Sequence, residues 1–494
     1  MPIVAVCEIN PPKPKGDAVP PQTPVTFVRM AAVDADAGAI TDPQTRSFAE
    51  ARNGFTSFRN DDVILAKITP CFENGKAAIC RGLLNGLGFG STEFHALRSK
   101  GAVLPEYLYH FVRQKSFCHD GQQNMTGSVG QKRVPATWLS AVPIPLPPLA
   151  EQKRIVAKVE EVLARVNAAR RRLAKVPAIL KRFRQAVLAA ACSGRLTADW
   201  REGGSDLESV QDLIHRLRLQ RGILRSDLGL LDLPAGWSWT NLKTLMDPQE
   251  PFCYGVVQPG TDDPDGVFLV RAGDLEDGSV NMSNLRRIPR SVDTAYRRSR
   301  LRGGELLVTV VGAGIGESAI APERCSGYNI ARAVAKIPIR HFSPRYVRLW
   351  MESETARGWM DADAREVARP TLNLEQLQTL PVPVPPEAEQ NEIVRRVEGI
   401  FSLVDSAEAR VAAGMRRAEK MVQAVLAKAF RGELVPTEAE LAEKEGRGFE
   451  SAEQLLARIR AARQAASAAS VSAPRRSGRP RPRRSSAAPG ITPA

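Results

Sequence analysis

The chain reads Pro143-Ile-Pro-Leu-Pro-Pro148 and then Ala150-Glu151-Gln152, and the second half repeats this pattern as Pro381-Val-Pro-Val-Pro-Pro386 and Ala388-Glu389-Gln390. The two copies are 238 residues apart, and the offset holds without a gap for 54 residues, 23 of which are identical. Self-similarity of this length at a fixed offset indicates an internal duplication. We therefore expect two halves with the same architecture.

Each copy continues into a long segment with helical periodicity, which we call the first rod (149–194) and the second rod (387–432). Apolar residues recur at alternating steps of four and three, which keeps one stripe facing a partner helix, as in a coiled coil. Pro177 removes a backbone donor and should kink or restart the first rod. The predicted seam residues are Ile155, Val159, Val162, Val166, Leu173, Leu180 and Val187 in the first rod, and Ile393, Val397, Ile400, Val404, Val411, Met415, Val422 and Val425 in the second.

A region of mixed strand and helix signals precedes each rod. Val63–Ile68 and Leu306–Val311 are strand-like apolar runs. Leu233-Pro-Ala-Gly-Trp237 opens the second region and has no clear counterpart near Met1. The expected order is a first mixed domain (1–148), the first rod (149–194), a connector (195–232) with a short helix at 209–222, a second mixed domain (233–386), the second rod (387–432), a C-terminal segment (433–463) with a short helix, and a disordered tail (464–494).

Composition indicates the partner and the compartment. The formal net charge is +15, and this excess of cations is typical of proteins that bind polyphosphate. The seven cysteines are scattered and form no CxxC pair, and no uncharged apolar run approaches the roughly 20 residues that cross a bilayer. We expect a soluble cytoplasmic protein without a membrane association.

Two cationic clusters are candidates for DNA contact. Lysine and arginine reach phosphates, while Arg, Lys, Asn and Gln read base edges in the major groove. The loop Thr126–Arg133 is rich in glycine and ends in three such residues, and a dense arginine stretch lies in the second mixed domain. The candidate DNA-binding residues are Lys76, Arg98, Asn124, Gln131, Lys132, Arg133, Arg286, Arg287, Arg290, Arg297, Arg298, Arg300, Arg302, Arg332, Arg365 and Arg369.

Catalytic and metal sites find little support. No two of the five histidines have metal-ligand spacing with a carboxylate. Gly312-Ala-Gly314-Ile-Gly316 lacks both the GxGxxG spacing and a P-loop lysine, so it reads as a tight turn. We expect no catalytic residue, no metal and no enzyme activity in this chain.

The duplicated proline-rich motifs, Ala429-Phe-Arg-Gly-Glu-Leu434 and Leu233-Pro-Ala-Gly-Trp237 resemble the specificity subunits of type I restriction–modification systems over nearly the whole chain. The resemblance implies an α+β fold in which two homologous target-recognition domains are separated by two long helices that form an antiparallel coiled coil with a pseudo-twofold repeat. It also implies recognition of a bipartite, asymmetric double-stranded DNA target.

In that family the helices dock two methyltransferase subunits, and a restriction (translocase–endonuclease) subunit joins them. S-adenosylmethionine, ATP and Mg are expected in those partners, so the resemblance assigns no cofactor to this chain. Two alternatives stay open: the specificity partner of a fused restriction–methylation enzyme, and a coiled-coil scaffold or adaptor that does not bind DNA.

Overall fold

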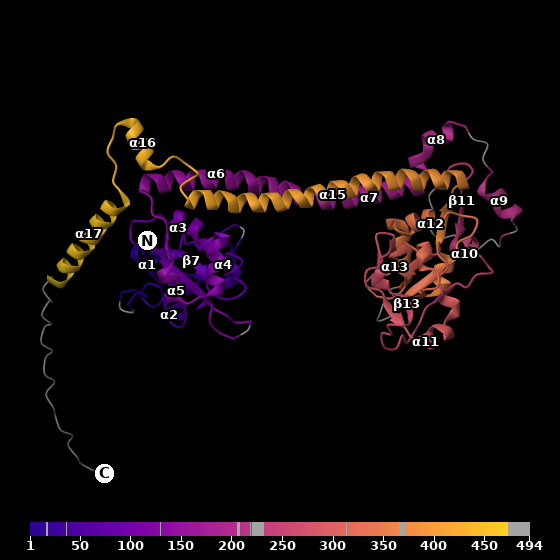
Figure 1. Cartoon of the computed structure of the whole chain (residues 1–494), viewed down its shortest axis with the longest axis horizontal. Coiled ribbons are helices and arrows are strands. Elements are labelled where there is room, and N and C mark those ends of the chain that lie inside the picture. Colours follow the sequence, from indigo (N-terminus) through magenta and orange to yellow (C-terminus); the bar gives the residue numbers. More distant parts are fainter. Residues whose placement is uncertain are drawn as a thin grey trace, which may run out of the picture. The chain divides into compact units, whose positions relative to one another are not determined.

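The computed structural model of the chain describes residues 1–15, 18–35, 37–128, 130–204, 208–217, 219, 232–312, 314–364 and 371–472. The chain divides into two compact units. Unit 1 consists of Met1–Arg171 with Met415–Ala494, and unit 2 consists of Arg172–Gly414. Each unit thus combines one mixed domain with a part of each rod (Figure 1).

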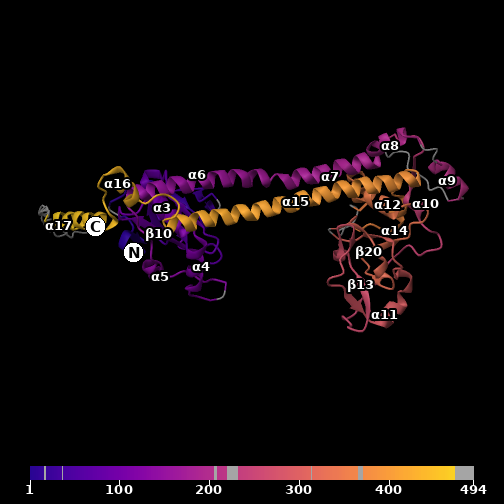
Figure 2. The ribbon, with the colours of Figure 1, turned by 45° about the horizontal axis from the view of Figure 1, so that its top comes forward.

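Both rods are helical, and only the first is interrupted. The second rod is one continuous helix of 44 residues, α15 (Glu387–Phe430), as Figure 2 shows. The first rod consists of α6 (Leu149–Leu173) and α7 (Val176–Cys192). Pro177 lies in the first turn of α7, where its missing N–H removes no helical hydrogen bond. The proline therefore restarts the helix.

Within unit 2 the two rods run antiparallel. The part of the first rod that belongs to unit 2 begins near Leu173. The side chain of Leu173 lies close to Gly414 of the second rod. Farther along, Arg184 forms an ion pair with Glu408 at 3.3 Å. Near the end of α7, Ala191 shares a buried cluster with Ile393. The contacts move toward the start of α15 as α7 advances.

Unit 1 has the same antiparallel pairing of rods. Arg154 near the start of α6 forms an ion pair with Glu438, which follows α15. Arg170 near the end of α6 lies close enough to Glu419 to lower the pKa of that carboxyl, after the larger effect of Lys115. All predicted seam residues of both rods are buried or half-buried, so the apolar stripes are covered.

The mixed domain of unit 1 is built on two four-stranded sheets in the described residues, with a further two-stranded pair, β3-β4. The first has the order β1-β10-β7-β8 and is antiparallel; the second has the order β5-β2-β9-β6, with β2 and β9 parallel. The strands are β1 (Cys7–Ile9), β2 (Pro24–Val28), β3 (Val33–Asp34), β4 (Ala39–Ile40), β5 (Gln44–Ser47), β6 (Thr56–Arg59), β7 (Val63–Ala66), β8 (Ala77–Ile79), β9 (Leu87–Gly90) and β10 (Phe94–Ser99). The helices are α1 (Ile3–Val6), α2 (Phe48–Ala51), α3 (Pro105–Val112), α4 (Lys115–Gln123) and α5 (Ala136–Ala141).

Unit 2 repeats this topology. Its two larger sheets have the orders β12-β20-β17-β18 and β16-β13-β19, again with one parallel pair, β13 and β19, and two-stranded sheets are formed by β11 with β21 and by β14 with β15. The strands are β11 (Ser238–Asn241), β12 (Cys253–Tyr254), β13 (Val267–Val270), β14 (Leu275–Glu276), β15 (Ser279–Val280), β16 (Arg286–Ile288), β17 (Leu306–Thr309), β18 (Ser318–Ile320), β19 (Asn329–Ile330), β20 (Val334–Ile337) and β21 (Pro381–Val384). The helices are α8 (Ala198–Glu202), α9 (Val210–Arg216), α10 (Leu242–Leu245), α11 (Arg290–Ala295), α12 (Pro344–Met351), α13 (Glu354–Ala364) and α14 (Leu374–Thr379).

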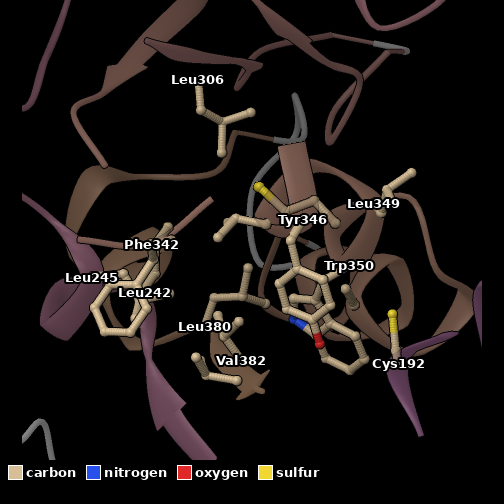
Figure 3. Close-up of a cluster of buried hydrophobic side chains, with 14 of the residues drawn as sticks. Cys192, Leu242, Leu245, Leu306, Phe342, Tyr346, Leu349, Trp350, Leu380 and Val382 are labelled. Atoms are coloured by element: carbon tan, nitrogen blue, oxygen red, sulfur yellow. The ribbon is translucent and has the colours of Figure 1, made fainter. Parts of the chain in front are cut away.

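The two predicted apolar runs form central strands because both of their faces are covered. In β7, Leu65 faces one buried cluster and Ile64 the other. In β17, Leu306 and Leu307 divide in the same way between two clusters. Figure 3 shows Leu306 in the larger cluster of unit 2, with Tyr346 and other side chains from α12. Strands buried on both faces lose the usual alternation of apolar and polar residues.

The C-terminal helices differ from the expected boundaries. α16 (Glu438–Glu445) is followed by α17 (Ala452–Ser472), which continues beyond residue 464, where the sequence predicts a disordered tail. The reason is that this stretch is rich in alanine, the strongest helix former, and contains no proline before Pro474. The short helix expected at 209–222 is α9, which ends at Arg216. Residues 218, 220–231 and 473–494 lie outside the described residues.

A search of the described residues finds no helix that is long and apolar enough to span a membrane. The same residues contain no cluster of three or more histidine, cysteine or acidic side chains arranged to hold a metal ion.

Candidate nucleic-acid interface

The glycine-rich loop of unit 1 joins α4 to α5 beside the first sheet. Its two ends are joined because Thr126 and Arg133 exchange backbone hydrogen bonds of 2.9 and 2.8 Å. The loop is also tied to the segment that follows β7, since the Thr69 N–H donates to Lys132 O at 3.0 Å. Gly127 has a φ of +119°, a conformation that disfavours larger residues. The loop is therefore a closed turn with a fixed base, which we call the unit 1 loop (124–133).

Arg133 holds this base with its side chain. Its Nε and Nη2 donate to the two carboxylate oxygens of Glu93 at 2.9 and 2.8 Å, and its Nη1 donates to Gln131 O at 3.0 Å. The hydrogen bonds from Arg133 lower the pKa of Glu93. Because the pairing with Glu93 and the bond to Gln131 O together occupy all three guanidinium nitrogens, Arg133 orders the loop rather than presenting an unoccupied cation.

His95 secures the segment that follows the loop. Its Nε2 lies 2.9 Å from Val134 O and its Nδ1 lies 3.1 Å from the Asn10 side-chain nitrogen. The first contact requires a donor and the second an acceptor, so the ring is neutral with its proton on Nε2. Burial is the main cause that lowers the pKa of His95. This neutral form is therefore favoured, and it fixes the loop to β10.

Two of the residues that are predicted to contact DNA remain available for such a contact in the unit 1 loop. Gln131 and Lys132 are exposed, and neither side chain has a hydrogen-bond partner among the described residues. Asn124 is exposed and donates from Nδ2 to Asp120 O at 2.8 Å, which leaves its amide oxygen available. The unit 1 loop thus exposes the amide group of Gln131 and the ammonium group of Lys132, which are adjacent in the sequence.

The remaining candidates in unit 1 are engaged elsewhere. Arg98 makes two hydrogen bonds to the buried Asp62 at 2.9 and 2.7 Å, an arrangement that serves the fold. Lys76 donates to Met30 O at 3.1 Å. It lines a polar cleft of about 870 Å³ together with Arg113 and Arg170. The structure therefore brings Lys76 near other cations but places Arg98 in a structural ion pair.

In unit 2 the arginine stretch divides into paired and exposed side chains. Arg300 pairs with Asp293 and Arg302 with Glu250. Arg286 and Arg287 donate to backbone carbonyls, and Arg287 also stacks over the Phe268 ring at 4.4 Å. Four predicted arginines are exposed, and their side chains have no hydrogen bond or ion pair among the described residues: Arg290, Arg297, Arg298 and Arg332.

Arg365 and Arg369 lie outside the described residues, but their place in the chain corresponds to the unit 1 loop. In unit 1 the loop ends at a bridge between Ile68 and Arg133, and in unit 2 a bridge between Val311 and Thr371 takes the same place. Both segments join corresponding helices, α4 to α5 and α13 to α14. The repeat thus assigns residues 365–370 to the same connection in the chain.

The sequence reasoning missed the residues that hold the interface in place. Glu93 and His95 carry no local signal, because their partners lie about 40 residues away.

The glutamines of the duplicated motif did carry a signal in the sequence. Gln152 accepts from Leu104 N at 2.9 Å, and Gln390 accepts from Ser343 N at 2.7 Å. Each glutamine therefore ties the start of a rod to the start of the proline-led helix of its own domain.

The glutamates of the motif bind the segments that follow the opposite rod. Glu151 accepts from Glu438 N at 2.7 Å. Glu389 accepts from Thr197 Oγ1 at 2.7 Å and from Trp237 Nε1 at 2.8 Å, and it forms an ion pair with Arg201. Each copy of the motif thus connects three parts of one unit: the mixed domain, the start of one rod, and the segment that follows the other rod.

Lys132→Ala is expected to reduce the salt dependence of DNA binding. One phosphate contact contributes about 0.9 to the slope of log K against log salt concentration, so the slope should fall by about one unit. Fluorescence anisotropy with duplex DNA at several salt concentrations measures it. Lys444→Ala, an exposed position on α16, should leave the slope unchanged.

Glu93→Gln is the companion variant, because it acts on the loop without removing a cation. It should speed hydrogen exchange at the Thr126 and Arg133 amides, whereas Lys132→Ala should not. An unchanged salt slope in Lys132→Ala would remove this residue from the phosphate contacts.

Sequence comparison relates the chain to known proteins. A family described as type I restriction modification DNA specificity domain matches residues 6–178. The specificity subunit of the type I restriction enzyme EcoBI from Escherichia coli is 43% identical over 311 residues, which is 63% of this chain and 62% of that protein. The EcoEI specificity subunit from Escherichia coli is 24% identical over 475 residues, 83% of this chain and 79% of that protein. The chain thus spans less than two thirds of the EcoBI relative and about four fifths of the EcoEI relative.

Solved structures share the fold. The HsdS subunit from Thermoanaerobacter tengcongensis has a TM-score of 0.54 at 22% identity, covering 88% of this chain and 96% of that chain. A chain from a type I restriction–modification system, solved to explain complex assembly and conformational transition, has a TM-score of 0.66 at 22% identity, covering 88% and 97%. These likenesses confirm the predicted α+β fold class. The chain is thus similar, in the sequence of its first recognition domain and in its fold, to DNA specificity subunits of type I restriction–modification systems.

Proposed function

We propose that this chain is the non-catalytic subunit that gives a type I restriction–modification complex its DNA sequence specificity, by recognising a bipartite, asymmetric target. The observation that carries the proposal is the repeated scaffold with unlike cationic surfaces. Both units have the same sheet scaffold, yet unit 1 exposes Gln131 and Lys132 in its loop while unit 2 exposes a set of arginines elsewhere among its described residues. Similar scaffolds with different exposed side chains suit two unlike half-sites.

The positions of the rods within each unit support a scaffolding role. Phe183 and Met421 are equivalent residues of the repeat, 238 positions apart, and their side chains are 46% and 51% exposed. Leu403 on α15 is 72% exposed. Large apolar side chains on an otherwise solvated helix surface are typical of protein contact sites. Their recurrence at equivalent positions fits two copies of one methyltransferase subunit, with a restriction subunit completing the complex.

No step of the chemistry is assigned to this chain. Some of its described titratable groups form ion pairs that hold the fold, as Arg133 with Glu93 and Arg201 with Glu389 illustrate. In this proposal the partner subunits bind S-adenosylmethionine, ATP and Mg, and the chain presents them with DNA.

A methylation map of a host that carries the complete system tests the proposal. The expected result is a split, non-palindromic motif with a gap between its halves. Replacing the unit 1 loop (124–133) by a neutral Gly-Ser loop should then relax one half of the motif and leave the other readable. One continuous short motif, or equal loss of both halves, would contradict the proposal.

A further inference from the structure

The two rods are copies of one sequence, so the pairing of identical rods is a physical alternative to the pairing of unlike rods within each unit. The duplicated segments share 23 of 54 residues, and the apolar stripe runs along both rods. The first rod of one chain could therefore pair with the first rod of a second chain, and the second rods likewise. Apolar seams alone do not distinguish these arrangements. The distinction has to come from polar residues at the seam or beside it.

Arg184 is such a residue. It takes a position of the apolar repeat in the first rod, where the second rod has Val422. The Arg184 side chain is 26% exposed, and its guanidinium lies over the Phe401 ring, 5.0 Å from the centroid. It forms ion pairs with Asp405 and, at 3.3 Å, with Glu408 of the second rod. A single polar residue in a helical seam can fix the partner at some cost in stability.

The acidic partners of Arg184 occur only on the second rod. The repeat places Arg170 of the first rod at the position of Glu408. In unit 1, Arg170 lines the same cleft as Val422, so the cation there lies near an apolar side chain. Two first rods would instead bring Arg184 of each chain to Arg170 of the other. Like charges that meet at a contact suppress the wrong pairing.

A second pair of facing positions has the same distribution of charge. In unit 1, Arg170 of the first rod lies close enough to Glu419 of the second rod to lower the pKa of that carboxyl, after the larger effect of Lys115. The equivalent positions in unit 2 are Glu408 and Lys181. The first rod thus supplies the cation and the second rod the acid at both places. Two second rods would bring Glu408 of each chain to Glu419 of the other.

The composition of the rods extends this difference. The first rod (149–194) has eleven lysines and arginines and three acidic residues, whereas the second rod (387–432) has eight and seven. Two first rods would therefore join two strongly cationic helices. The pairing of unlike rods joins a cationic helix to a nearly neutral one.

We propose that Arg184, together with Asp405 and Glu408, selects the pairing of unlike rods and so prevents two copies of this chain from associating through identical rods. Each mixed domain is attached to its rods, so the pairing of identical rods would combine two identical domains. The selection keeps one domain of each kind together. It does not depend on what the domains bind, so it can be tested without DNA.

Val422→Arg gives the second rod the selecting cation in addition to its own acids. In unit 1 the new guanidinium lies near Arg170, whereas between two second rods it meets Asp405 and Glu408. The wild-type chain should sediment as a monomer. The variant should form a dimer, with a dimer fraction at least about tenfold higher than that of the wild type, because a like-charge contact is exchanged for a complementary one. Sedimentation velocity at several protein concentrations measures it.

Arg184→Glu tests the other rod. It places an acid beside Asp405 and Glu408 within one chain but beside Arg170 between two first rods, so it should form a dimer as well. Arg184→Ala is the matched control, because it removes the cation and creates no attraction between identical rods. This control should stay monomeric, since pairing within one chain has the higher effective concentration.

The double variant Val422→Arg/Arg170→Glu restores a complementary pair within unit 1 and should return the chain to a monomer. Salt at 1 M should also dissociate the dimers of the single variants, because the Debye length falls to about 3 Å. Circular dichroism shows which variants keep their helix content. The proposal is overturned if the folded variants Val422→Arg and Arg184→Glu stay monomeric. It is also overturned if Arg184→Ala or the wild-type chain dimerises as strongly as Arg184→Glu.

Discussion

Glu389→Ala should destabilise the chain by about 3–5 kcal/mol, the usual result of removing one partner from a buried ion pair. The Glu389 side chain is 1% exposed and receives hydrogen bonds from Thr197 and Trp237 as well as the Arg201 ion pair. Alanine would leave these donors in an apolar region without an acceptor, and each unsatisfied donor costs free energy. Urea denaturation followed by circular dichroism measures the loss.

Glu387→Ala is the matched control for this variant. Glu387 lies two residues earlier in the first turn of α15 and is exposed, so its removal should change the free energy of unfolding by no more than about 0.5 kcal/mol. Equal effects of the two variants would show that the buried glutamate does not hold the segment after α7. Glu151→Ala gives the same comparison in unit 1, where the acceptor for Glu438 N is lost.

The double variant Val397→Lys/Val404→Lys should separate the rods and prevent assembly with partner subunits. Val397 is fully buried and Val404 is 4% exposed. An uncompensated charge at a buried position costs about 3–5 kcal/mol. Two such charges on the same apolar stripe should cost more free energy than the packing of the two helices supplies. Circular dichroism should show loss of helix. Gel filtration with methyltransferase subunits should show loss of the complex.

The control variant places the same two charges on the outer face of the same helix. Ser402 and Leu403 are exposed, so Ser402→Lys/Leu403→Lys should keep the helix content of the wild-type chain. If the seam variant also keeps its helix content and its complex, the apolar stripe is not what joins α15 to the first rod.

The fold was predictable from the sequence because its signals are local or repeated. The steps of four and three residues in the rods, the restart at Pro177 and the apolar runs of β7 and β17 each depend on neighbours in the chain. The duplication added an internal check, since the helical periodicity of the rods and the apolar runs occur in both halves. The extent of α17 was missed because charge and low aliphatic content concealed a stretch of alanine with strong helix propensity.

The interface was less predictable, because its cations differ in their partners and not in their sequence context. Lys132 and Arg133 are adjacent, yet one is exposed and the other is bound to Glu93. Arg98 belongs to a buried ion pair with Asp62. Ion pairs between residues 36 to 40 positions apart leave no pattern in composition or periodicity. The sequence alone therefore identifies the cationic regions. It cannot distinguish the cations that form ion pairs within the fold from those that are exposed and available to contact DNA.

The alternation of proline in β21 makes this strand accept a neighbour on one edge only. Successive N–H groups of a strand point to opposite edges, and every N–H on one edge of β21 is removed by Pro381 or Pro383. The remaining edge is satisfied by β11. A segment built in this way cannot propagate a sheet from one molecule to the next. The protein can therefore keep this apolar strand in a two-stranded sheet at high concentration without seeding aggregates.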